Sequence, residues 1–503
     1  MTLAMRAIAL ILLLLAIPPA HAAGTMRYGL EQDPDILDPA RNGSYGDRVV
    51  FTTMCDQLLD IDPKLNFVPQ LATAWTWSDD RLSLTLNLRP GVVFQDGAPF
   101  DAEAVRINLD RYRTAPESLR KTELSPIVGV DVIDPLTLRI RLSAPYAPLL
   151  SLLANRPGTP LSPRILTLKP DEIAANPVCA GPFRFVSRVA QDRIVLEKFP
   201  GYWNAAAIDL DRIEFRIATD ANVRRVNLQS GGFDIVGRLA PTDVPAIDAD
   251  KRLRVMSSPS LGYQMLSFNL SKGPLSNIPF ARDARVREAF EKSIDRVALN
   301  QVVYEGLYVP SNQTEAPGSR YYDATHPVPP RDLAGAKALM RAAGLERTGF
   351  GLIIGNDPVS AQVGQVLQAM AQEAGIDVKL TQMEGATMVA AAKSGDYQAS
   401  MGIWSGRPDP DGNISIWMAC KGFLNWGGYC NPALDNALTR AAQVTDPAQR
   451  APLYAQAAAI WLADRPHMVL YHFTWLWGVR AGITGLVPRP DGLLRWENVR
   501  LAQ

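Results

Sequence analysis

One ten-residue segment, Trp404 to Asn413, contains the side chains best suited to hold a small charged molecule. It reads WSGRPDPDGN and places an indole, a guanidinium group and two carboxylates among rigid prolines. Arg407 could donate a forked pair of hydrogen bonds to a carboxylate, while an aspartate holds an ammonium group and the indole covers apolar atoms. A zwitterionic solute fits this set; the alternative is a surface turn whose arginine and aspartates pair with each other. The candidate ligand-binding residues here are Trp404, Ser405, Gly406, Arg407, Asp409 and Asp411.

Patterns typical of enzymes are missing from the sequence. It contains no GxSxG elbow, no HExxH, no phosphate-binding glycine loop and no dinucleotide fingerprint. An acid–base pair of Asp409 and Asp411, and hence a periplasmic hydrolase, is a remote alternative because Arg407 and the prolines favour a solvated or ion-paired turn. We therefore predict a binding protein rather than an enzyme, with no cofactor.

Histidines offer little for a metal site. The chain has four of them. His467 and His472 flank the apolar segment MVLY, and a spacing of five residues points them to opposite faces of a strand. A structural role is the stronger interpretation, so we predict no metal ligands, and binding of a metal chelate stays a weaker alternative.

The elements that lead to the charged segment alternate between strand and helix. Predicted strands cover 350–355, 376–380 and 397–403, and the helices between them begin near Ser360 and Thr387 and end at Gly375 and Gly395. This alternation indicates a parallel α/β sheet. Ligands of such sheets bind beyond the carboxyl ends of the strands, and the strand 397–403 leads directly into Trp404.

The first half of the chain has the pattern of hairpins. Ser83 to Arg89 alternates strictly, and alternating runs near 128–132 and 138–142 flank the turn Asp134-Pro135. Asp101 is placed to cap a helix. No low-complexity linker separates the two halves, so we expect the chain to cross between its lobes several times.

Composition indicates an exported globular protein. Residues 1–22 contain a basic start, an apolar run too short to span a bilayer and the small residues of a cleavage site, which predicts a signal peptide; an uncleaved anchor is the alternative. The 503 residues favour two or three domains. Basic and acidic residues number 51 each, which argues against nucleic acid as a partner and against electrostatic attachment to a membrane.

The four cysteines suggest two disulfides in an exported chain. Cys420 and Cys430 bracket a short glycine- and aromatic-rich loop, whereas Cys55 and Cys179 would close a long one. The alternative that one pair is simply two buried thiols stays open.

Three stretches resemble a known family. They are Leu71–Val105 (LATAWTWSDDRLSLTLNLRPGVVFQDGAPFDAEAV), Asn176–Phe183 (NPVCAGPF) with its follow-on FPGYW at 199–203, and Phe280–Val297 (FARDARVREAFEKSIDRV). Together they are similar to the bacterial extracellular solute-binding proteins of family 5, the peptide, nickel and opine receptors of ABC importers. The resemblance runs from about residue 26 to the C-terminus.

The resemblance implies an α/β fold, that of a two-lobed type II periplasmic binding protein whose lobe I carries an inserted subdomain. By analogy, lobe I comprises 23–46, 185–262 and 475–503, the inserted subdomain 47–184, and lobe II 263–474. The ligand lies between lobes that close by a hinge motion. The protein is expected in the periplasm, as a monomer that delivers its ligand to inner-membrane permease subunits. Cys179 replaces a small residue of the family motif, which supports its pairing with Cys55.

The resemblance also bears on the ligand. Family dipeptide receptors carry an aspartate three residues after the tryptophan of this loop, and Arg407 stands at that position. This departure counts against a plain dipeptide and favours a ligand with an accessible carboxylate, such as a γ-linked peptide like glutathione, or an opine. The family as a whole implies a di- or oligopeptide or a peptide-like solute, with glutathione, an opine, a metal chelate or haem as the alternatives. Three further candidates come from family positions: Tyr263 and Asn269 in YQMLSFNL, for which sheet packing is the alternative, and Tyr45, which follows an early loop near the ligand.

Overall fold

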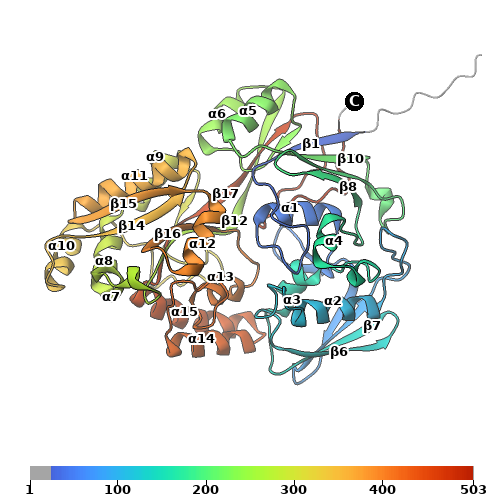
Figure 1. Ribbon diagram of the computed structural model, residues 1–503, viewed down its shortest axis with the longest axis horizontal. Coiled ribbons are helices and arrows are strands. Elements are labelled where there is room, and N and C mark those ends of the chain that lie inside the picture. Colours follow the sequence, from blue (N-terminus) through green and yellow to red (C-terminus); the bar gives the residue numbers. More distant parts are fainter. Residues whose placement is uncertain (1–23, 502–503) are drawn as a thin grey trace, which may run out of the picture.

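The computed structural model describes residues 24–501, so the predicted signal peptide lies outside the described residues. Figure 1 shows two lobes side by side, joined by strands that pass from one to the other. No helix within the described range combines the length and apolar character that a bilayer-spanning segment needs.

One mixed sheet of eleven strands runs through both lobes. Its order is β15-β14-β16-β12-β17-β11-β1-β10-β9-β8, and β13 pairs with β17. The strands are β1 (Thr25–Leu30), β8 (Phe183–Val189), β9 (Arg193–Lys198), β10 (Arg212–Ile217), β11 (Ile235–Val236), β12 (Leu253–Phe268), β13 (Val309–Pro310), β14 (Thr348–Gly355), β15 (Ile376–Met383), β16 (Ala399–Trp404) and β17 (His467–Arg480).

Lobe I, at the right and top of Figure 1, surrounds β1 and β8 to β11. It also contains β2 (Leu59–Ile61) paired with β3 (Phe67–Pro69), and a four-stranded sheet of order β4-β5-β7-β6. Those strands are β4 (Ala72–Trp77), β5 (Ser83–Leu88), β6 (Ile127–Asp134) and β7 (Thr137–Leu142). Its helices are α1 (Tyr45–Met54), α2 (Ala102–Thr114), α3 (Leu149–Leu153), α4 (Pro170–Ala175), α5 (Ala221–Ser230) and α6 (Val244–Asp248).

Lobe II, at the left of Figure 1, surrounds β14 to β16. Its helices are α7 (Pro279–Arg282), α8 (Ala284–Ser293), α9 (Arg296–Tyr304), α10 (Leu333–Ala342), α11 (Pro358–Gln372), α12 (Gly385–Ser394), α13 (Asp411–Met418), α14 (Pro432–Gln443) and α15 (Pro447–Asp464). Strand β14 pairs in parallel with both β15 and β16, which confirms the predicted parallel α/β arrangement.

The predicted local signals hold with small shifts of their ends. Asp101 caps α2 by accepting from the backbone N–H of Ala104 at 2.9 Å. Helix α11 begins two residues earlier than expected, because Asp357 caps it and Pro358 is tolerated in a first helical turn. Gly395 ends α12 with a φ of 83°, a left-handed conformation that glycine adopts without steric cost.

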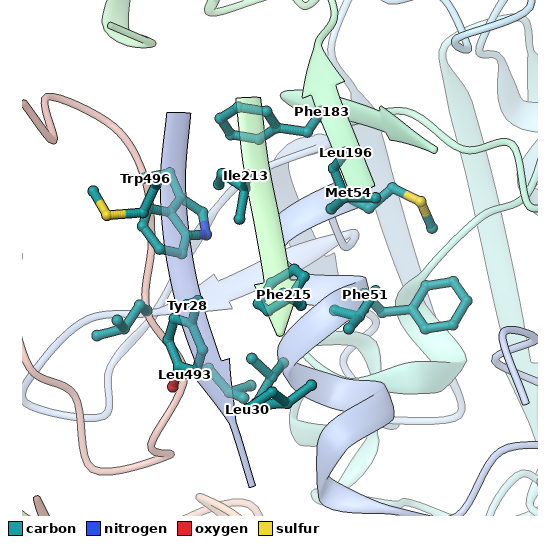
Figure 2. Packing of buried hydrophobic residues seen from close by; sticks show 14 of the residues in the cluster. Tyr28, Leu30, Phe51, Met54, Phe183, Leu196, Ile213, Phe215, Leu493 and Trp496 are labelled. Carbon is teal, nitrogen blue, oxygen red and sulfur yellow. The ribbon is translucent and has the colours of Figure 1, made fainter. Parts of the chain in front are cut away.

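Lobe I is built from distant parts of the sequence. Tyr28 of β1 packs on Phe215 of β10 with 5.4 Å between ring centroids. Trp496, near the C-terminus, joins the same core and donates a hydrogen bond from its indole to Thr53 Oγ1 at 2.8 Å. Figure 2 shows Tyr28, Phe215 and Trp496 together with Phe51 and Met54 of α1, which belong to the same cluster of buried residues. Burial of one large apolar side chain stabilises the folded state by about 1.5–3 kcal/mol. Through Trp496, the C-terminal segment therefore contributes to the stability of lobe I.

Two long strands connect the lobes. Strand β12 pairs with β17 from Leu253–Arg480 as far as Pro259–Thr474, and the pairing resumes at Tyr263–His472 after an irregularity. Near that irregularity the core changes from the cluster around Tyr28 to those around Phe290 and Trp461. The chain thus crosses between the lobes on two strands, and the predicted domain boundaries stay a prediction.

Both predicted disulfides are present. Cys55 pairs with Cys179, with 5.5 Å between their Cα atoms, and Cys420 pairs with Cys430 at 4.3 Å. The first bond joins the end of α1 to the segment before β8, since Cys55 is the C-cap of α1. The second closes the loop between α13 and α14.

Candidate functional site

The charged turn lies where the two lobes meet. It follows directly on β16, whose last residue, Trp404, pairs with Tyr263 of the crossing strand β12. Gly406 has a φ of 78°, and a β-carbon on it would lie 2.3 Å from the carbonyl carbon of Leu261. Glycine is therefore required both by the backbone conformation and by close contact with the lobe connection. The turn is thereby held against the connection between the lobes.

Asn413 organises the inside of the turn. Its Oδ1 accepts hydrogen bonds from the backbone N–H of Arg407 at 2.7 Å and from Nε1 of Trp404 at 3.1 Å. Its Nδ2 donates to the carbonyl of Arg407 at 3.0 Å and to Glu315 Oε1 at 2.9 Å. All hydrogen-bonding capacity of this buried amide is in use, so the turn is held in one conformation.

Arg407 has no carboxylate partner among the described residues. Its Nη1 donates to the carbonyl of Gly406 at 2.7 Å and lies 3.5 Å from Ser405 Oγ. The guanidinium carbon lies 4.3 Å from the centre of the Trp404 ring, a cation–π contact. Burial, and then the positive charges of Arg48 and Arg156, lower the pKa of Arg407 well below its usual range. An anion beside this group would satisfy its free donors.

Three arginines of lobe I lie in the same environment. Arg48 of α1 donates to Ser405 Oγ at 3.1 Å, so it shares one acceptor oxygen with Arg407 across the two lobes. Arg156 donates from Nε to Asn42 Oδ1 at 2.6 Å, and Arg120 donates to the carbonyl of Asn42 at 3.2 Å. We call Arg48, Arg120, Arg156 and Arg407 the arginine cluster; their exposed fractions are 6%, 6%, 6% and 9%.

Few acidic groups compensate the arginine cluster. Glu123 accepts from Arg120 at 2.9 Å. Burial and the charges of the neighbouring arginines lower the pKa of Arg156 to about 9. The charge of the buried Asp47 raises that pKa, but by less than these effects lower it. Four guanidinium groups thus lie near three carboxylates, those of Glu123, Asp47 and Asp491, and only Glu123 forms an ion pair with one of the four. A further anion would complement the remaining positive charge.

Asp409 and Asp411 occupy different environments from Arg407. Asp409 accepts two hydrogen bonds from Arg450 of α15, at 2.7 and 2.9 Å, and both side chains are buried. Asp411, the first residue of α13, accepts from Ser415 Oγ at 2.5 Å and lies 3.5 Å from the Tyr146 hydroxyl of lobe I. Burial raises the pKa of Asp411 to about 6. The turn therefore does not pair its own arginine with its own aspartates.

Glu315 is an acidic group of this site that the sequence did not single out. Its Oε1 accepts from Asn413, and no cation among the described residues forms an ion pair with it. Burial raises its pKa to about 8, with a further increase from the charge of Asp409. A carboxylate held in this way beside Asn413 suits an incoming ammonium group.

The remaining predicted residues separate into two groups. Tyr45 opens α1 one turn before Arg48, stacks on Trp475 of β17 with 4.8 Å between centroids, and donates to the carbonyl of Gly492 at 2.6 Å. Tyr263 is fully buried, and its hydroxyl donates to the carbonyl of Asn413 at 2.6 Å. Both lie at the contact between the lobes or directly behind it.

Asn269 lies apart from the turn. It follows β12, six residues beyond Tyr263, or about 20 Å along an extended strand. Its Nδ2 donates to three backbone carbonyls, those of Lys272, Gly395 and Tyr397. The structure does not bring Asn269 together with Trp404 and Arg407.

Other parts of the described chain hold the two histidines considered above and two surface hollows. The two histidines beside MVLY are buried, with pKa values lowered to about 4 by burial. Residues 24–501 contain no group of three potential metal ligands. Two shallow surface hollows lie elsewhere, one between α11 and β15 and one beside β8.

The sequence could not reveal the lobe I arginines or Glu315. Arg48 and Ser405 are separated by 357 positions, and Glu315 and Asn413 by 98. None of these residues stands in a motif whose spacing indicates a charge site. Asn413, by contrast, could have been proposed from the sequence, because it is the last residue of the charged segment.

Two lobes joined by two strands, with a charged turn at their contact, are the architecture of the two-lobed periplasmic binding proteins. A family model described as bacterial extracellular solute-binding proteins, family 5, matches residues 66–425. The chain belongs to this family, the substrate-binding components of ABC importers.

Known relatives agree with this assignment. The glutathione-binding protein GsiB of Pectobacterium atrosepticum is 29% identical over 483 residues, covering 93% of this chain and 92% of the relative. The binding protein AgaA of Agrobacterium tumefaciens R10, solved with agropinic acid, superimposes with a TM-score of 0.86 at 24% identity, covering 95% of this chain and 99% of that one. A dipeptide-binding protein from Pseudoalteromonas sp. SM9913, solved with Met-Leu, gives 0.86 at 21% identity, covering 95% and 100%.

Proposed function

We propose that this protein captures a peptide-like solute with a free carboxylate and a free ammonium group, with glutathione as the first candidate, and delivers it to an ABC permease. The observation that carries the proposal is Arg407, a buried guanidinium group without a carboxylate partner at the contact between the lobes. The glutathione-binding relatives, 29% identical over nearly the whole chain, support the choice of ligand.

Each ligand group has a proposed partner. Arg407 and Arg48 receive a carboxylate, because they already converge on one oxygen, that of Ser405. Glu315 receives the ammonium group; Asp409, by contrast, is held by Arg450 and supports the turn. Trp404 and Tyr45 cover apolar atoms between these ends. Glutathione has two carboxylates and one ammonium group and can satisfy all of these contacts.

The test is calorimetric titration of the mature protein with glutathione and with neutral dipeptides. Arg407→Ala should weaken glutathione binding about 30-fold or more, since loss of a desolvated charged contact costs about 2–5 kcal/mol. The melting temperature of the unliganded variant should stay near that of the wild type, because Arg407 stabilises no carboxylate. Arg341→Ala, an exposed arginine of α10, is the matched control and should change neither quantity.

Unchanged affinity in Arg407→Ala would remove this residue from the site. Mass spectrometry of whatever co-purifies with the protein tests the ligand class without a prior choice: a peptide-like acid supports the proposal, and an uncharged solute contradicts it. An opine or a metal chelate in that experiment would keep the receptor function and replace glutathione.

We further propose that the protein is exported through a signal peptide cleaved near Ala23, acts in the periplasm as a monomer, needs no cofactor, does not bind nucleic acid and does not turn over its ligand. N-terminal sequencing of protein from the periplasm should begin near Ala23. Prolonged incubation with glutathione should return the ligand intact, and hydrolysis of it would revive the enzyme alternative.

A further inference from the structure

The arginine cluster is divided between the lobes in a way that affects their closure. Arg407 belongs to lobe II, and Arg48, Arg120 and Arg156 belong to lobe I. Each of the four has an exposed fraction of 9% or less in this arrangement. Bringing the lobes together therefore removes like charges from water and places them side by side.

The hydrogen bonds inside the arginine cluster go almost entirely to neutral oxygens. Arg48 and Arg407 share the Ser405 hydroxyl, and Arg120 and Arg156 share Asn42. Arg120 also pairs with Glu123, yet its Nε has no partner. Neutral acceptors orient guanidinium groups but do not neutralise them. The cluster is therefore positioned for a further anion, since only Arg120 of the four forms an ion pair among the described residues.

Other contacts between the lobes contain no pair of like charges. The backbone N–H of Ala147 in lobe I donates to the carbonyl of Ala442 in lobe II at 2.8 Å, and Tyr146 meets Asp411. These two contacts need no ligand, whereas the positive charges of the arginine cluster repel one another when the lobes meet.

We propose that closure of the two lobes is gated by charge: it becomes favourable only when an anionic group of the ligand lies among Arg48, Arg120, Arg156 and Arg407. This inference rests on the proposed function and adds to it a selection rule. Ligands with a free carboxylate close the protein, and analogues of the same shape without a carboxylate bind without closing it. The empty protein would then stay open and differ in shape from the closed, liganded protein. A permease that recognises the closed shape would not be occupied by empty receptors.

The first experiment measures closure by small-angle X-ray scattering of the mature protein with and without ligand. Glutathione at saturation should reduce the radius of gyration. Glutathione diethyl ester, which has the same backbone but no free carboxylate, should bind roughly 100-fold more weakly and leave the radius unchanged at saturation. Equal closure by acid and ester would overturn the proposal.

The second experiment needs no ligand. Arg407→Gln removes one charge from the cluster, so the closed-to-open ratio of the unliganded protein should rise roughly tenfold, the effect of removing one partly screened repulsion. The same variant should bind glutathione at least tenfold more weakly. Weaker binding with greater spontaneous closure is a combination that ordinary loss of a ligand contact does not produce.

Two matched variants separate charge from structure. Ser405→Ala removes the shared hydroxyl but no charge, so it should not increase closure of the unliganded protein. Arg341→Gln removes a charge from α10, at the far end of lobe II in Figure 1, and should leave both closure and affinity at wild-type values. Greater closure in either variant, or none in Arg407→Gln, contradicts charge gating.

Failure of the inference and failure of the proposed function give different results. If glutathione and dipeptides do not bind at all, the proposed function fails, while the unliganded comparison of Arg407→Gln with wild type still tests the gate. If glutathione binds and its ester closes the lobes equally well, the function stands and the gate is wrong.

Discussion

Arg450 of α15 holds the carboxylate of Asp409 through two hydrogen bonds, at 2.7 and 2.9 Å, and the side chains are 5% and 8% exposed. The Arg450 terminal nitrogen also donates to the Tyr454 hydroxyl at 2.9 Å. This pair joins the charged turn to the last long helix of lobe II, and it explains why a carboxylate so close to Arg407 does not pair with it.

Replacing Asp409 by Asn should therefore reduce the stability of the protein. Loss of one partner leaves Arg450 charged and buried, which costs about 3–5 kcal/mol. Urea unfolding of the unliganded variant measures this change. Asp377→Asn, in the exposed pair with Arg347, is the matched control and should cost about 1 kcal/mol or less. Wild-type stability of the Asp409 variant would mean that Arg450 finds another partner.

Glu315 should give ligand binding a proton signature. Its pKa is raised to about 8 by burial, so the free protein holds a proton there at pH 7. A ligand ammonium group beside it favours the carboxylate, and binding should then release close to one proton. Calorimetry at pH 7 in buffers of different ionisation enthalpy measures the release. Glu315→Gln should release none, and equal release from both proteins would place the ammonium group elsewhere.

The same residue should affect stability in a known direction. Its folded pKa of about 8 lies above the ordinary 4.5, so between these values the folded state binds more protons than the unfolded state. Its contribution is fully present below pH 4.5 and is lost as pH rises towards 8. Glu315→Gln should therefore gain stability relative to wild type as pH increases from 5 to 8, measured by urea unfolding at both values.

Gly406 should tolerate no side chain. Its positive φ and the 2.3 Å approach to Leu261 mean that Gly406→Ala must move the turn or the lobe connection. We expect lower stability, by about 1–3 kcal/mol, together with weaker ligand binding. Gly402→Ala, in the preceding strand, is the control, since its β-carbon would meet only Met265 Cε at 3.9 Å. Similar effects of both substitutions would rule out the special role of Gly406.

The two disulfides should differ in their contribution to stability. In the chain-entropy model a bond between cysteines 124 residues apart is worth about 5 kcal/mol, and one between cysteines 10 residues apart about 3 kcal/mol. The double variant Cys55→Ser/Cys179→Ser should therefore have the lower melting temperature of the two double-serine proteins. A lower melting temperature for Cys420→Ser/Cys430→Ser would show that local geometry outweighs loop length.

Local patterns predicted the framework well. The alternation of strand and helix from Phe350 to Ile403 depends on short-range periodicity, and it is observed with ends shifted by up to three residues. The cysteine pairs could also be anticipated, since four cysteines allow only three ways of forming two disulfides. The position of Asn269 could not be predicted in this way. Its place in the family sequence, near the strand that connects the lobes, does not indicate which way its side chain points.

The sequence by itself determined the class of fold, the family and the position of a charged turn after a buried strand, because each of these is written in contiguous residues. Only the tertiary structure decided which charges meet. Arg48, Arg156 and Arg407 come from separate segments, and their separation in space depends on how the two lobes pack through β12 and β17. Charge interactions act through space rather than along the chain, and so the arginine cluster and the pairing of Asp409 with Arg450 emerge only on folding.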